Sequence, residues 1–221
     1  MSLIGLSGLD RRSWLQSLRT SAWLILIAVL GILLSWIALR IVWTQADHDL
    51  TAALYNIGSN DIVARLAWAV ASVGNVIWVP LVFWLYVFRK DNSEWTSALV
   101  LAVAAVASMA LSDLLKLLFH LPRPFTAFPT EFVPRFSIPT NYAFPSGHTT
   151  MAFTVLAVVW RRYQPWRVPF LALAIGTGIG MMIVGLHFAS DVLAGAFLGT
   201  ISGVFATTLA RVRAEVKPVT S

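Results

Sequence analysis

The sequence predicts an all-α fold: a polytopic membrane protein with six transmembrane helices and a short amphipathic helix on the outer surface. Of its 221 residues, 58% are hydrophobic and 12% are charged, which is typical of a chain that lies in lipid. Long apolar runs recur along the chain, and most basic residues fall in the short segments on one side of these runs. There is no cysteine, which excludes a disulfide framework, a thiolate metal site and a cysteine nucleophile.

The apolar runs define the predicted transmembrane helices. An uncharged run of about 20 residues is long enough to cross a hydrocarbon core of about 30 Å. The six runs are residues 21–39, 62–88, 95–116, a short fourth run that ends at 160, 168–186 and 192–210. We expect them to form one membrane domain, residues 21–211, between a cytoplasmic or interfacial segment, residues 1–20, and a cytoplasmic tail, residues 212–221.

The amphipathic helix is predicted between the first two runs, in residues 44–61. Acidic residues there alternate at helical spacing with apolar ones such as Leu50, Leu54 and Ile57. This pattern predicts a helix that lies on the outer surface, and it indicates no function.

The basic residues orient the chain, because short loops rich in Lys and Arg stay in the cytoplasm. One side of the six-helix arrangement collects Arg11, Arg12, Arg19, Arg89, Lys90, Arg161, Arg162, Arg167, Arg211, Arg213 and Lys217. The prediction is a multi-pass protein of the cell membrane with both termini in the cytoplasm. The formal charge of +6 therefore reflects membrane topology and predicts no nucleic-acid partner.

Three basic residues, Lys116, Arg123 and Arg135, crowd the opposite side, between the third and fourth runs. Basic residues oppose translocation, so we expect these to meet an anionic ligand. Lys116 and Arg123 suit a phosphate in particular, because Arg makes bidentate contacts and Lys acts as a compact point charge. The alternative is that both side chains extend to the headgroup region. Asp113, one helical turn before Lys116, suggests an ion-pair partner.

The segment 141–150, which contains Pro145-Ser146-Gly147-His148, predicts an anion cradle at the start of the fourth helix. Pro145 suits a helix start, Ser146 can cap or donate, and Gly147 lets a backbone N–H approach a ligand closely. The positive end of the helix dipole would face the ligand. The alternative is an ordinary capped helix.

His187 and Asp191 stand four residues apart near the start of the last run. At this spacing the carboxylate can accept a hydrogen bond from one ring nitrogen and leave the other free, which makes the imidazole a nucleophile or a base. Two alternatives remain: an interfacial histidine beside a helix-capping aspartate, or half of a metal site shared with His148. A carboxylate at this depth is costly, which favours function.

Together these groups resemble the type 2 phosphatidic acid phosphatase superfamily of membrane lipid phosphatases. Its pattern is Lys, six residues, Arg-Pro; then Pro-Ser-Gly-His; then Ser-Arg, five residues, His, three residues, Asp. The first part is matched by Lys116, Arg123 and Pro124, the second by residues 145–148, and the third by His187 and Asp191. The match covers roughly residues 113–195.

The chain departs from the pattern at the Ser-Arg pair, where Gly180 and Met181 stand. Losing one charge-assisted phosphate contact would cost roughly 2 to 4 kcal/mol of transition-state stabilisation. Either activity is low or another cation replaces the arginine. Arg135 is the candidate, because it lies in the loop before the cradle.

The resemblance implies a metal-independent hydrolase without a cofactor, with a phosphohistidine intermediate and an outer, periplasmic or extracellular active site. His187 would attack phosphorus, Asp191 would orient it, and His148 would protonate the leaving oxygen and then activate water. The phosphate oxygens would contact Lys116, Arg123, Ser146, Gly147 and, as the replacement cation, Arg135.

The substrate would be a lipid phosphate in the bilayer, either an isoprenoid diphosphate such as undecaprenyl diphosphate or a phosphatidate-type monoester, and no obligatory protein partner is predicted. Three alternatives stay open. They are a lipid phosphotransferase, a lipid-phosphate-binding member weakened by Met181, and a metal-dependent hydrolase that uses His148, His187 and Asp191.

Overall fold

The computed structural model describes residues 44–88 and 92–215, and this part of the chain contains helices and loops but no β-strand. The all-α prediction is thus confirmed for it. The α-helices are α2 (Thr44–Ile57), α3 (Asp61–Val76), α4 (Trp78–Phe88), α5 (Asn92–Phe119), α6 (Pro124–Ala127), α7 (Gly147–Arg162), α8 (Arg167–Ile183) and α9 (Ala189–Glu215), and a short 3-10 helix, η1 (Gln164–Trp166), precedes α8.

Within these ranges, four stretches are long and apolar enough to cross a membrane: Asp61–Val82, Ala98–Ala127, Gln164–Ile183 and Ala189–Ala210. They correspond to the second, third, fifth and sixth predicted runs. The first run, 21–39, lies outside the described residues. The fourth run is α7, which has only 16 residues and is not among the four. The count of six therefore stays a prediction.

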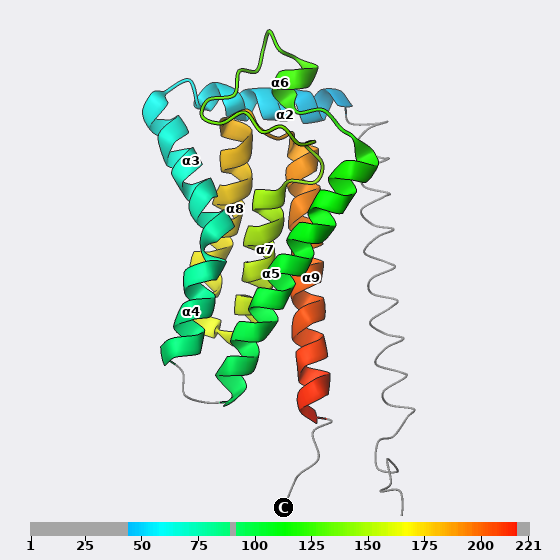
Figure 1. Ribbon diagram of the computed structural model, residues 1–221. Helices are drawn as coiled ribbons and strands as arrows, with labels where there is room; N and C mark the ends of the chain where they lie inside the picture. The colour runs from blue at the N-terminus through cyan, green and yellow to red at the C-terminus, as the bar shows by residue number, and fades with distance from the viewer. Residues whose placement is uncertain (1–43, 89–91, 216–221) are drawn as a thin grey trace, which may run out of the picture.

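Helix α7 lies inside the bundle and contacts α3, α5, α8 and α9 (Figure 1). Its first turn lies below the upper ends of α8 and α9 in this view. Helix α2 crosses the same end of the bundle, beside α6 and the loop that leads to α7. A helix is therefore present where the amphipathic one is expected, while its amphipathic character and outer position stay predictions.

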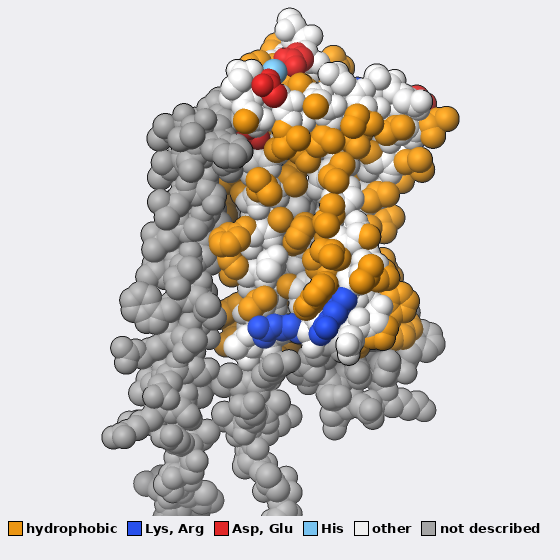
Figure 2. All heavy atoms as spheres, turned by 180° about the vertical axis from the view of Figure 1, so that it is seen from behind, with side chains coloured by type: hydrophobic (Ala, Val, Ile, Leu, Met, Phe, Trp, Pro, Cys, Tyr) orange, Lys and Arg blue, Asp and Glu red, His pale blue; other side chains and the backbone are white. Residues whose placement is uncertain are grey.

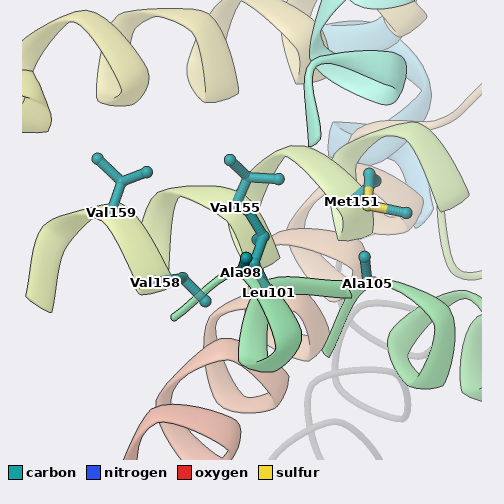
Figure 3. Close-up of a cluster of buried hydrophobic side chains, with 7 residues drawn as sticks. All are labelled: Ala98, Leu101, Ala105, Met151, Val155, Val158 and Val159. Carbon is teal, nitrogen blue, oxygen red and sulfur yellow. The ribbon is translucent and has the colours of Figure 1, made fainter. Parts of the chain in front are cut away.

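Packing between α5 and α7 fixes the inner helix. Small residues on α5 face branched side chains on α7, which lets the two backbones approach closely. The buried cluster consists of Ala98, Leu101 and Ala105 of α5 with Met151, Val155, Val158 and Val159 of α7 (Figure 3).

Helix α9 approaches the other face of α7 through three glycines spaced one turn apart, Gly195, Gly199 and Gly203. A Cβ on Gly195 would lie 2.6 Å from the carbonyl oxygen of Ser146, and one on Gly203 would lie 2.6 Å from that of Thr154. Larger residues at these positions would push the two helices apart. The glycines therefore set the distance between α9 and the start of α7.

The outside of the bundle is apolar along its length. Figure 2 shows hydrophobic side chains over the visible face, with basic side chains near the end opposite α2 and α6. Such a surface suits lipid as the surrounding solvent, and it agrees with the membrane character that the composition predicts.

Candidate active site

A cavity of about 320 Å³ lies below the loop that joins α6 to α7. It is lined by Asn75, Met109, Asp113, Lys116, Arg123, Ser137, Ile138, Pro139, Asn141, Gly147, His148, Met181, Leu186 and His187. All three sequence groups thus meet in one place, although they come from α5, α7 and the α8–α9 turn. Of the predicted site residues, Ser146, Asp191 and Arg135 do not line it.

His187 lies in the turn between α8 and α9 and is buried, with 2% of its surface exposed. Its Nδ1 lies 3.3 Å from Oδ2 of Asp191, and its Nε2 lies 3.2 Å from Nη1 of Arg123. A guanidinium can only donate, so Nε2 accepts, and Nδ1 carries the hydrogen and donates it in a hydrogen bond to Oδ2 of Asp191. The lone pair of Nε2 therefore meets the guanidinium of Arg123, and both residues line the cavity.

Asp191 is held rigidly behind this histidine. The same Oδ2 accepts a hydrogen bond of 2.9 Å from the backbone N–H of Phe188, and only 1% of the residue is exposed. One carboxylate oxygen thus fixes both the turn and the imidazole ring. The contact between the carboxylate and the ring is the one that the spacing of four residues predicts, while the orienting role of Asp191 in a reaction stays a prediction.

Arg123 is fixed by four oxygen acceptors. Nε donates to the carbonyl oxygen of Asn141 at 2.9 Å, and Nη1 donates to that of Leu186 at 2.9 Å. Nη2 donates to Oδ1 of Asn141 at 2.7 Å and to the carbonyl oxygen of Tyr142 at 3.4 Å. The guanidinium therefore occupies a set position at the cavity wall and brings a positive charge to it.

Lys116 supplies the second positive charge and is 4% exposed. Its Nζ donates to Oγ of Ser112 at 3.0 Å and lies 3.5 Å from Oδ1 of Asp113. A Cβ on Gly147 would lie 3.4 Å from the same Nζ, so the absent side chain leaves the backbone of the cradle open toward this charge.

His148 follows Gly147 in the first turn of α7 and lines the cavity as well. Its ring lies 6.4 Å from that of Trp68 on α3, and Trp68 in turn stacks on Phe136 of the loop at 5.5 Å. The cavity therefore holds a second imidazole, carried by α7, whereas His187 lies in the α8–α9 turn.

Ser146 precedes α7 as expected, but its side chain makes no capping hydrogen bond. Its hydroxyl accepts from Oγ1 of Thr149 at 3.0 Å, and its backbone N–H donates to the carbonyl oxygen of Asp191 at 3.0 Å. Ser146 is fully buried and joins α7 to α9. This arrangement places its hydroxyl behind the cavity wall.

Arg135 is not brought to the cavity. Its guanidinium lies 4.2 Å above the ring of Tyr55 and donates to the carbonyl oxygen of that residue at 3.0 Å. The loop that contains Arg135 is thus attached to α2. The prediction assumed that a loop residue close to the cradle in sequence also faces it. The side chain of Arg135 instead leaves the loop toward α2.

Met181 is fully buried beside Ala71, Val184 and Leu186, and it forms part of the cavity wall. Two further wall residues, Asn75 of α3 and Met109 of α5, were missed as site residues. An amide inside an apolar run is the signal that could have identified Asn75. Nothing in the sequence separates Met109 from a packing residue.

The alternative of a metal-dependent hydrolase needs a ligand set. Within residues 44–88 and 92–215, no group of three or more His, Cys, Asp or Glu side chains is arranged to hold a metal ion. The histidines and the aspartate of the site therefore form no such group.

Curated relatives and solved structures resemble this chain in different regions. It is 44% identical over 73 residues to a lipid A 1-phosphatase of Rhizobium etli, an alignment that spans 31% of this chain and only 30% of that protein. It is 21% identical over 159 residues to undecaprenyl-diphosphatase BcrC of Bacillus subtilis, covering 71% of this chain and 80% of that one.

The fold resembles two solved structures. A transmembrane PAP2 type phosphatidylglycerolphosphate phosphatase from Bacillus subtilis matches with a TM-score of 0.69 and 20% identity, covering 89% of this chain and 98% of that one. LpxE of Aquifex aeolicus matches with a TM-score of 0.61 and 28% identity, covering 72% of this chain and 93% of that one.

The family model of the PAP2 superfamily matches residues 97–214, which contain all three sequence groups and more than half of the chain. The protein therefore belongs to the PAP2 superfamily.

Proposed function

We propose that this protein is an integral membrane phosphatase that hydrolyses a lipid phosphate or diphosphate through a phosphohistidine at His187. The observation that carries the proposal is the geometry of His187, whose Nδ1 is held by Asp191 while its Nε2 lies beside Arg123 at the wall of the cavity. An imidazole oriented in this way is a nucleophile, and the adjacent guanidinium stabilises the oxygens of the group that it attacks.

In the first step, Nε2 of His187 forms a bond to phosphorus while the bond from phosphorus to the lipid oxygen breaks. His148 gives that oxygen a proton. Lys116, Arg123 and the backbone N–H of Gly147 stabilise the equatorial oxygens. In the second step, His148 takes a proton from water, the water oxygen attacks phosphorus, and the bond to Nε2 breaks to release phosphate.

The substrate is a lipid because the site belongs to a bundle with an apolar outer surface. Two of the relatives are named for their action on lipid A 1-phosphate and undecaprenyl diphosphate, so a phosphatidate-type monoester and an isoprenoid diphosphate are both suitable tests. The start of α7 lies below the bundle end, so we propose that the lipid reaches the cavity sideways from the bilayer. Basic side chains near the opposite end favour an outer active site and cytoplasmic termini.

The proposal is tested by the release of inorganic phosphate from a panel of lipid phosphates and diphosphates by the purified protein in detergent with EDTA. We expect release to continue in EDTA and to be abolished by His187→Ala. Radiolabelled substrate quenched in base should leave an acid-labile label on the wild type but not on His187→Ala. Activity in His187→Ala would refute the nucleophile, and loss in EDTA would support a metal-dependent reaction.

Two alternatives are separated by the same assay. Transfer of the label to a lipid alcohol in place of water would identify a phosphotransferase. Binding of the lipid without release of phosphate would identify a lipid-phosphate-binding member. This alternative stays open because the apolar Met181 lies in the cavity wall where the family pattern has an arginine.

A further inference from the structure

Helix α2 caps the first turn of α9, the turn that carries Asp191. Oδ1 of Asp47 accepts from the backbone N–H of Ser190 at 2.8 Å, and Oδ2 accepts from the hydroxyl of Ser190 at 2.6 Å. Oγ1 of Thr51 accepts from the backbone N–H of Ala189 at 3.1 Å. The first N–H groups of a helix have no partner within it, so a distant segment supplies these acceptors.

The capped turn is the one that orients the nucleophile. The N–H group one residue before Ala189, that of Phe188, donates to Oδ2 of Asp191 at 2.9 Å. The same oxygen lies beside Nδ1 of His187. Three successive N–H groups, those of Phe188, Ala189 and Ser190, are thus held by side-chain oxygens. Any rotation of the turn would move Asp191 and the imidazole together.

Burial limits the access of water to the N–H groups of this turn. Thr51 is fully buried, and Ser190 is 8% exposed. Thr51 also donates to the carbonyl oxygen of Asp47 at 2.7 Å, which ties the two capping residues to each other. Removing an acceptor would leave a buried N–H without a partner, and the turn would have to move to recover one. A carboxylate is in addition the favourable charge at a helix N-terminus.

We propose that Asp47 is a positioning residue: through Ser190 it fixes the turn that holds Asp191 and directs Nε2 of His187 toward phosphorus. This inference rests on the proposed phosphatase function. It gives α2 a role in the reaction, although α2 lies outside residues 97–214, which the family model matches, and Asp47 does not line the cavity.

The test compares Asp47→Ala with Asp47→Asn and with the control Asp49→Asn, which removes an exposed carboxylate two residues later on the same helix. With phosphatidate in detergent, Asp47→Ala should lower kcat at least about tenfold and leave KM within about twofold, because the substrate contacts are intact and the nucleophile is misplaced. Asp47→Asn should recover most of the rate, because its amide oxygen still accepts from Ser190. Asp49→Asn should match the wild type.

A double-mutant cycle separates positioning from a general loss of structure. If Asp47 acts through Asp191, adding Asp47→Ala to Asp191→Asn should lower kcat little further. Additive losses, or kinetics of Asp47→Ala equal to those of Asp49→Asn, would overturn the proposal.

Should Asp47→Ala fail to fold, Thr51→Val, which removes the acceptor of Ala189, should show the same loss of kcat, and Thr51→Ser should restore it. Normal kcat in Thr51→Val would then refute the proposal.

Failure of the proposed function would be recognised separately, as a wild type that releases no phosphate from any lipid on the panel. The cap is then tested by amide hydrogen exchange of the peptide that contains residues 188–191. Exchange should be faster in Asp47→Ala than in Asp49→Asn. Equal exchange would overturn the positioning role.

Discussion

Nη1 of Arg123 lies 3.2 Å from Nε2 of His187, although the two residues are 64 positions apart in the chain. The contact joins the residue that directly precedes α6 to the α8–α9 turn and places a fixed positive charge beside the proposed nucleophile. It also selects the tautomer of His187, because the guanidinium has no lone pair to offer. The proposed nucleophile thus contacts a residue from a different sequence group.

The first prediction concerns this guanidinium. Arg123→Lys keeps the charge but cannot make the contacts to Asn141 and Leu186 while facing the nucleophile. We expect kcat to fall by about 10²- to 10³-fold, which is the usual cost of one lost oxyanion donor. The matched control is Arg161→Lys on the exposed end of α7, measured with the same lipid phosphate. A loss of less than about threefold in Arg123→Lys would show that charge alone suffices.

The second prediction concerns the glycines of α9. Gly195→Ala places a Cβ against the carbonyl oxygen of Ser146, next to the cradle, whereas Gly203→Ala places one against Thr154, two turns deeper along α7. Each should destabilise the bundle by about 1–3 kcal/mol through overpacking. Only Gly195→Ala should also lower kcat in the folded fraction, because only that contact displaces Ser146. Thermal unfolding and kinetics in detergent separate the two effects; equal kcat values in both variants would contradict the expectation.

The third prediction concerns Met181. Its side chain lies in the cavity wall, whereas Met182 does not line the cavity. Met181→Arg should place a guanidinium in the cavity and raise kcat/KM by up to about tenfold, because one charge-assisted contact to phosphate is gained. Met182→Arg should instead destabilise the protein, since its charge has no access to the cavity. An equal or lower rate in a folded Met181→Arg variant would mean that Lys116 and Arg123 suffice.

The fourth prediction concerns Arg135, whose guanidinium lies over Tyr55. Arg135→Ala should weaken the attachment of the loop to α2 and lower the melting temperature more than Arg65→Ala, which removes an exposed pair with Asp61. Met181→Arg should not restore the loss, because Arg135 and Met181 occupy different places. Rescue of Arg135→Ala by Met181→Arg would instead support the replacement of the missing arginine by Arg135.

The fifth prediction concerns pH. Hydrogen bonds to Asp49 and to Glu131 raise the pKa of His48 above its usual 6.5, and His48 ties α2 to the loop. A pKa that is raised on folding adds stability that is fully present below the unfolded-state pKa and is lost as the pH rises through the folded-state pKa. The wild type should therefore exceed His48→Gln in melting temperature at acidic pH, and the difference should shrink above neutrality. A difference that is independent of pH would show that the contact does not depend on the charge.

The sequence by itself determined the features that depend on neighbours along the chain. The apolar runs predicted where the membrane helices lie, because lipid requires every backbone polar group to be satisfied within a helix. The spacing of His187 and Asp191 predicted their contact, since residues four apart share a helix face or turn. Helix α7 begins at Gly147, within the segment 141–150 that predicted its start.

Only the tertiary structure decided what lies between segments that are far apart in the chain. It placed Asn75 and Met109 in the cavity wall, set Arg135 against Tyr55 and joined the backbone N–H of Ser146 to the carbonyl oxygen of Asp191. It also brought Asp47 to the first turn of α9. These outcomes depend on how closely the helices approach each other. That distance is set by glycines and alanines that pack between two helices, so it cannot be read from the sequence of either helix alone.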